Sequence, residues 1–190
     1  MAVNRIRKQL ASASLIALLA FIPATLLAES RGSAEAELLR TRATGIELTG
    51  EHDSYRLVPE GVVAIDSVAS PANAEWRRQL GRYELSLGGE PRKEQRNLPS
   101  SPYQMAYNPR TGKPAVVTGK IVTWLQPGTS AATVAQRCGL QVAADFPHLG
   151  VAYLELSGST SLPDAIARVA ADPAVKRSYP EIIENVRKAR

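Results

Sequence analysis

An alternation of strand and helix periodicity over residues 116–183 constrains the fold more than any other feature of the sequence. Residues 116–125 are rich in β-branched residues, which predicts a strand. Residues 130–139 follow with apolar positions on one helical face, a serine able to cap the first turn and a glycine able to end the helix. Two runs with apolar residues at every second position, residues 140–146 and 151–156, then predict two strands joined by a turn.

A second helix and a last strand complete this order. Ser161 can cap the helix, Asp172-Pro173 ends it, and residues 175–183 form the strand. The order β-α-β-β-α-β predicts an α+β ferredoxin-like domain, in which a four-stranded antiparallel sheet carries two helices on one face. The other face has no helix of this domain to cover it. It can serve as a docking surface, although antiparallel sheets also often leave one face to water.

The rest of the chain divides into segments by composition. We expect a signal peptide at residues 1–28, a helical or disordered segment at 29–44, a small β-rich module at 45–92, a linker and hairpin at 93–114, the ferredoxin-like domain at 115–184 and a basic tail at 185–190.

The signal peptide is indicated by three basic residues within the first eight, followed by an apolar run from Leu15 to Ala28. We expect cleavage after Ala28, although Leu26 at the minus-three position is large, and cleavage after Ala24 or an uncleaved membrane tether stays open. The sequence therefore predicts a secreted or periplasmic protein that meets the membrane only transiently. Residues 1–28 carry three of the 23 basic and none of the 18 acidic residues, so the net charge of +5 falls to +2 without them.

Composition excludes several classes of function. One cysteine and two histidines cannot build a closed structural zinc site, and we expect no metal and no cofactor. Aromatic residues make up 5% of the chain and basic residues are scattered among acidic ones, which argues against nucleic-acid binding. A single cysteine also forms no internal disulfide, so the fold depends on packing.

Short segments within the predicted domain resemble a known family. They are Gly119-Lys120-Ile121-Val122, Pro127-Gly128, Gly139-Leu140, the turn at Gly150, Asp172-Pro173-Ala174-Val175 and Tyr179-Pro180-Glu181. In order and spacing these segments resemble the propeptide domain of subtilisin-like serine proteases, which also occurs as free-standing subtilisin inhibitors. The resemblance covers residues 117–183.

This resemblance implies protein binding. In the family, the open sheet face packs on two helices of the protease and the C-terminal tail lies in the substrate cleft as a product-like strand. Carboxylates after the last strand cap those helices; Glu181 matches one of them, whereas the other position is Tyr179, which carries no charge. Trp124 alternates with Thr123 and Leu125, which favours the open face. The implied protease-binding residues are Trp124, Glu181, Ile182, Ile183, Arg187, Lys188 and Arg190.

Features that resemble catalytic groups have simpler structural explanations. The segment around Ser130 is similar to the motif around the nucleophilic serine of the subtilases, but Ser130 fits a helix cap. His52 with Asp53 fits a polar surface turn, and Cys138 fits the apolar side of a helix. We therefore expect no enzymatic activity.

Two hypotheses for function follow. The first is a secreted inhibitor, a folding chaperone or both, acting on a subtilisin-like serine protease; an isolated pro-region of a split or lost protease gene would share this chemistry. The alternative is a non-inhibitory structural or protein-binding module with a ferredoxin-like domain.

Overall fold

The computed structural model describes residues 24–66, 71, 73–89, 102–157 and 160–185. The chain divides into two compact units, residues 1–35 and 36–190. Helix α1 (Ala24–Arg42) begins in the first unit and ends in the second. The second unit holds all the strands of the described residues. None of the described helices is both long and apolar enough to cross a membrane.

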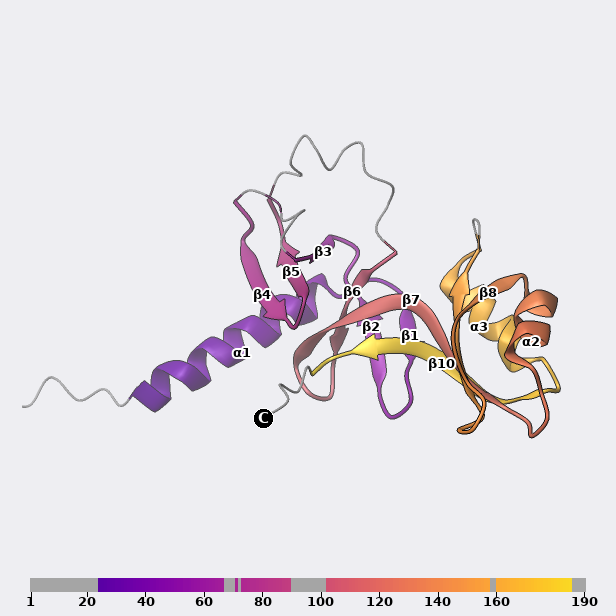
Figure 1. The fold of residues 1–190 in the computed structure, drawn as a ribbon. Helices are drawn as coiled ribbons and strands as arrows, with labels where there is room; N and C mark the ends of the chain where they lie inside the picture. Colours follow the sequence, from indigo (N-terminus) through magenta and orange to yellow (C-terminus); the bar gives the residue numbers. More distant parts are fainter. Residues whose placement is uncertain (1–23, 67–70, 72, 90–101, 158–159, 186–190) are drawn as a thin grey trace, which may run out of the picture. The chain divides into compact units, whose positions relative to one another are not determined.

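Seven strands of the second unit form one antiparallel sheet, in the order β1-β2-β6-β7-β9-β8 with β10 paired to β7. Figure 1 shows β7 and β10 running beside each other. The strands are β1 (Glu47–Thr49), β2 (Ser54–Leu57), β6 (Gln104–Asn108), β7 (Lys113–Leu125), β8 (Leu140–Phe146), β9 (Val151–Leu156) and β10 (Val175–Ile183).

Strand β7 organises this sheet because it pairs with three other strands. Residues 113–117 pair with β6 and residues 120–124 pair with β9, while β10 follows the opposite edge. Gly119 stands where the partner changes from β6 to β9. Its φ of +78° is unfavourable for other residues, and a Cβ at this position would lie 3.0 Å from the carbonyl oxygen of Pro102.

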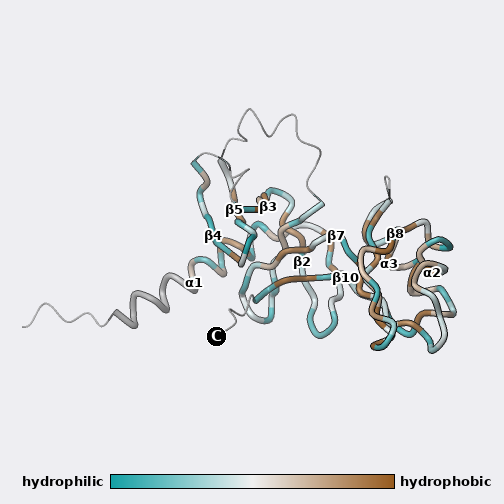
Figure 2. The backbone as a smooth tube through the Cα atoms, viewed as in Figure 1, coloured by the Kyte–Doolittle hydropathy of each residue, from teal (hydrophilic) through white to brown (hydrophobic). Residues whose placement is uncertain are grey.

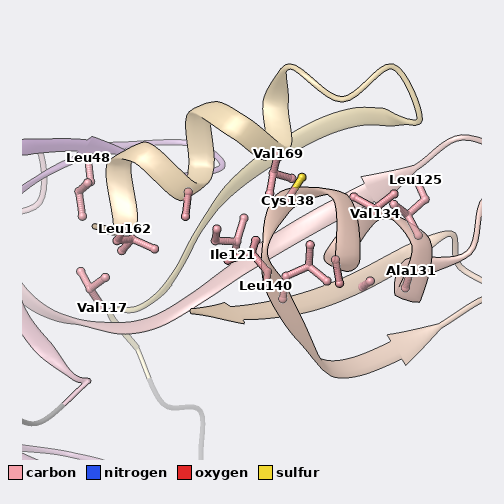
Figure 3. Close-up of a cluster of buried hydrophobic side chains, with 14 of the residues drawn as sticks. Leu48, Val117, Ile121, Leu125, Ala131, Val134, Cys138, Leu140, Leu162 and Val169 are labelled. Atoms are coloured by element: carbon pink, nitrogen blue, oxygen red, sulfur yellow. The ribbon is translucent and has the colours of Figure 1, made fainter. Parts of the chain in front are cut away.

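Helices α2 (Ala131–Cys138) and α3 (Leu162–Ala170) pack on one face of the sheet. The close-up in Figure 3 shows their apolar side chains meeting Ile121 and Leu125 of β7 in a first core cluster. The hydroxyl of Ser161 caps α3 by accepting a hydrogen bond from the Asp164 N–H. Ser130 precedes α2 with an extended backbone, but its side chain makes no capping hydrogen bond.

A buried carboxylate joins the ends of the two helices. Asp172, whose side chain is 5% exposed, accepts two hydrogen bonds of 2.8 Å from the guanidinium of Arg137 at the end of α2. It also accepts the N–H of Ala174. The hydrogen bond from Arg137 and then that from Ala174 hold the pKa of Asp172 below its ordinary value of 3.8.

The remaining three strands form a smaller antiparallel sheet in the order β3-β5-β4. These strands are β3 (Gly61–Ile65), β4 (Trp76–Leu80) and β5 (Tyr83–Leu87). Leu85 and Leu87 of this sheet pack with Leu39 of α1 and with Met105 and Val116 of the larger sheet in a second core cluster. Trp76 is half-buried against this cluster.

The predicted ferredoxin-like fold, with one four-stranded sheet and two helices, is wrong. The chain is mostly β, because β1, β2 and β6 join the same sheet and a separate three-stranded sheet accompanies it. The physical reason is the length of β7: its 13 residues reach beyond β9 and expose an edge that β6 covers. Figure 2 shows hydrophobic residues concentrated around β8, α2 and α3 and along the central strands.

Gly119→Ala should destabilise the fold more than Gly128→Ala. Both glycines have a φ near +78°, so each substitution costs about 1–2 kcal/mol in backbone strain. Only Gly119 meets a neighbouring atom, since a Cβ on Gly128 has nothing within 4 Å. Urea unfolding of the two variants measures this difference. Equal losses in the free energy of unfolding would show that the change of strand partner at Gly119, from β6 to β9, does not depend on close approach to Pro102.

Asp172→Asn should lower the free energy of unfolding by about 1–3 kcal/mol at pH 7. The folded-state pKa of Asp172 is depressed, so its contribution is present above the unfolded pKa and is lost as the pH falls through the folded value. The difference between parent and variant should therefore shrink below about pH 4 in urea titrations. Asp66→Asn, which removes an exposed ion pair with Arg82, serves as the control and should change little at either pH. A difference that is independent of pH would contradict this assignment.

Candidate protein-binding site

The face of the larger sheet opposite α2 and α3 carries a group of aromatic side chains. Ile121 and Leu125 of β7 point into the first core, so the alternate residues Val122 and Trp124 point the other way. The strand register brings residues of β8, β9 and β10 onto the same side. We call this set the aromatic face; its members are Trp124, Phe146, Tyr153, Arg177 and Tyr179.

The aromatic face lies outside both core clusters of the described residues. None of its members packs in either cluster, and Phe146 is 40% exposed. It holds four of the ten Trp, Tyr and Phe residues of the chain. Aromatic residues and arginine dominate the binding energy of protein interfaces, so this composition is typical of a docking surface.

Contacts among these side chains fix their positions. The guanidinium carbon of Arg177 lies 4.3 Å from the ring centroid of Trp124 and 5.7 Å from that of Tyr179. The indole N–H of Trp124 donates to the Tyr179 hydroxyl at 3.2 Å. Phe146 and Tyr153 meet edge to face with centroids 6.0 Å apart. Rings held in this way lose little conformational entropy on binding.

Charge at the border of the aromatic face comes from Arg177 and Glu51. Arg177 is ion-paired with Glu51, in the segment between β1 and β2, at 3.1 Å. Burial raises the pKa of Tyr179, which keeps its hydroxyl neutral at physiological pH. The face thus presents a neutral aromatic surface with one cation above it.

A second polar cluster fixes the end of β10. The Glu184 carboxylate accepts hydrogen bonds from the Tyr55 hydroxyl, the Asn108 amide and the Thr111 hydroxyl, at 3.2, 2.7 and 2.8 Å. Asn108 is fully buried. Burial, followed by the charge of Glu184, raises the pKa of Tyr55 to about 12. The cluster therefore holds the chain in place directly after its last strand.

The structure places the sequence-predicted binding residues in different surroundings. Trp124 lies on the aromatic face. The Glu181 carboxylate accepts a hydrogen bond from the Thr118 hydroxyl at 2.5 Å. Ile182 packs against the first core cluster and Ile183 against the second. Residues Arg187, Lys188 and Arg190 lie outside the described residues, as do residues 1–23 of the expected signal peptide.

Sequence reasoning missed most of the aromatic face. The alternation of apolar residues in β8 predicts that Val142 and Phe146 lie on one side of the strand. A bulge between Val142 and Ala144 instead moves the residues after it to the other side. Val142 therefore stands opposite Leu154 on the helix side, whereas Phe146 stands opposite Val151 on the other side. Nothing in the local sequence marks this bulge.

The features that resemble catalytic groups are not assembled into a site in the described residues. The His52 side chain is 81% exposed and lies 3.7 Å from the Glu51 carboxylate. Cys138 is buried on the inner side of α2, where burial raises the pKa of its thiol. Among the described residues, no three His, Cys, Asp or Glu side chains gather where they could hold a metal ion.

Glu184→Ala should lower the free energy of unfolding by about 1–3 kcal/mol, because it removes the acceptor of the Tyr55 and Thr111 hydroxyls and leaves the buried Asn108 amide with only its longer bond, of 3.3 Å, to Asp53. Glu47→Ala, which removes an exposed pair with Arg56 at 3.6 Å, should change it by less than about 0.5 kcal/mol. Urea unfolding at pH 7 compares the two variants. Similar small losses in both would show that the cluster does not hold the end of β10.

Comparison with known proteins identifies the family. Residues 63–189, more than half of the chain, match the family model described as the open reading frame 2 N-terminal domain. No curated protein and no solved structure matches the chain. The match overturns the resemblance to subtilisin-like protease propeptides, which rested on a few short Gly- and Pro-containing segments that mark turns in many folds. The chain belongs to the family of open reading frame 2 N-terminal domains.

Proposed function

We propose that this protein is a secreted or periplasmic protein-binding module that docks through its aromatic face. We propose further that its partner is a subtilisin-like serine protease, which it inhibits or helps to fold. The observation that carries the docking proposal is the aromatic face itself, partly exposed and outside both core clusters. The choice of partner does not rest on membership of the propeptide family.

Docking through this face is supported by the chemistry of its members. The indole N–H of Trp124 donates to the Tyr179 hydroxyl oxygen, so a partner can cover Trp124 without leaving this donor unpaired. Arg177 is already held over the rings and pays little further entropy on binding. Glu181 is engaged by Thr118, so the proposal places the docking contacts on the aromatic face and gives Glu181 no helix-capping role.

The choice of a protease is supported by the sequence after β10. The Glu184 cluster fixes the point from which the chain continues, and the basic residues Arg187, Lys188 and Arg190 follow. An extended segment can add to the edge of a substrate cleft by main-chain hydrogen bonds, and arginine would suit a protease that prefers basic residues.

The alternative, a non-inhibitory binding module, also has support. Ile182 and Ile183 are paired with β7 and packed against the two cores, so they belong to the sheet and are not free to enter a cleft. In that case the aromatic face would bind a partner whose activity is unchanged. Binding and inhibition must therefore be measured separately.

Phe146→Asp should weaken binding by about tenfold or more, whereas Val142→Asp should leave it unchanged. The two residues lie on the same strand and are 40% and 38% exposed, but they face opposite sides of the sheet. The measurement titrates the purified protein against a panel of secreted subtilisins, following hydrolysis of a chromogenic peptide and, by calorimetry, the binding itself. Trp124→Asp repeats the test on a second strand.

The outcomes distinguish the parts of the proposal. If the parent inhibits no subtilisin, binds none and fails to raise the refolding yield of any, the protease assignment is wrong. Equal effects of Phe146→Asp and Val142→Asp would exclude the aromatic face. Removal of residues 186–190 that abolishes inhibition and spares binding would support a tail in the cleft. Binding without inhibition or improved refolding would favour the alternative.

A further inference from the structure

Strand β8 forms one end of the larger sheet, and its outer side is open. Among the described residues it pairs only with β9, so the main-chain groups that point away from β9 have no strand partner there. Five of its seven residues are exposed. Unpaired main-chain N–H and C=O groups along a strand are ready partners for another extended segment. We call this open side of residues 140–146 the β8 edge.

Exposed apolar side chains gather at the β8 edge. Four large hydrophobic side chains are exposed in the part of the chain that the structure describes, and three of them lie on β8 or in the turn that follows it. These three are Val142, Phe146 and Leu149, which are 38%, 40% and 60% exposed. Single apolar residues are normal on protein surfaces, whereas a group of them beside an unpaired strand is typical of an interaction site.

Most of the features that protect a strand edge are missing from β8. Its seven residues include no lysine, arginine or proline, and they exceed the usual strand length of about five to six residues. Asp145 is its one charged residue. This side chain is exposed and, within the described ranges, makes no hydrogen bond or ion pair. A partner strand can therefore place a basic side chain opposite Asp145.

The bulge in β8 disfavours a second copy of the chain as the occupant. Residues that stand directly opposite each other in an antiparallel pair lie on the same face of the sheet. Leu140 and Val142 lie on the helix side, whereas Ala144 and Phe146, beyond the bulge, lie on the aromatic side. Two β8 strands related by a twofold axis would bring residues from before the bulge opposite residues from beyond it. Only pairings of three residues avoid this mismatch of faces.

The inner side of β8 shows what kind of segment fits this strand. Six residues of β9, residues 151–156, pair with the seven of β8 across the bulge. Apolar residues of β9 lie on both faces, with Tyr153 on the aromatic side and Leu154 on the helix side. A segment of about six residues with apolar side chains on both faces would likewise meet Phe146 on one face and Val142 on the other.

We infer that the β8 edge binds an extended, mostly apolar segment of another protein. The segment adds to the sheet as a further antiparallel strand and places a lysine or arginine opposite Asp145. The site shares Phe146 with the aromatic face, but it reaches the helix side through Val142 and does not depend on the partner that docks on the aromatic face. Main-chain hydrogen bonds provide affinity, and the side chains of β8 select the segment.

Val142→Asp tests this proposal in the full-length protein. The probe is a fluorescein-labelled Val-Lys-Val-Ile-Thr-Val peptide, which in the register of β9 places its lysine opposite Asp145 and its isoleucine opposite Val142. Fluorescence polarisation should show binding at least about tenfold weaker for Val142→Asp. Ile46→Asp, at the exposed apolar residue before β1, is the matched control and should change binding by less than about twofold. Val142→Asp leaves docking on the aromatic face intact, so the two proposals fail independently.

Two further measurements test the charge and the main-chain pairing. Asp145→Lys should weaken binding of the lysine probe at least about threefold, and a probe with glutamate in place of lysine should bind Asp145→Lys more tightly than it binds the parent. Only one side of an added strand faces β8. Of two probes that are N-methylated at alternate main-chain amides, one should therefore lose binding and the other should keep it.

Several outcomes overturn the proposal. It is wrong if the probe does not bind the parent, if Val142→Asp and Ile46→Asp behave alike, or if the two N-methylated probes behave alike. It is also wrong if the parent associates with itself in sedimentation and Val142→Asp makes it monomeric, because a second copy would then be the occupant.

Discussion

The pairing of β7 with β10 is the interaction on which the rest of the structure depends. Neighbouring residues of a strand point to opposite faces, and along this ladder both faces are covered. Val117 and Ile182 pack in or against the first core, while Val116 and Ile183 do so in the second. Each apolar side chain buried in this way contributes about 1.5–3 kcal/mol. One two-stranded ladder therefore forms the wall between two hydrophobic cores, and neither core is complete without it.

The other end of the same ladder has a different environment. Beyond Gly119, α2 and α3 cover only one face, and the residues on the opposite side change from aliphatic to aromatic. Val116 and Ile183 give way to Trp124, Arg177 and Tyr179. Rings with a polar group tolerate both water and a partner, and the indole N–H of Trp124 is already satisfied by the Tyr179 hydroxyl oxygen. The same two strands thus build the core at one end and present the proposed docking surface at the other.

Local patterns in the sequence explain some of this arrangement, and long-range pairing explains the rest. The alternation around Trp124 predicts that its side chain lies on the sheet face opposite the helices, and the apolar spacing in residues 130–139 predicts helix α2. The β-rich module expected at residues 45–92 groups β1 and β2 with β3, β4 and β5, whereas β1 and β2 pair within the larger sheet. Strands of three and four residues are too short for their sequence to specify a partner. The bulge after Val142 reversed the side on which Phe146 lies. Each of these features is decided by the strand across the ladder, which the local sequence does not reveal.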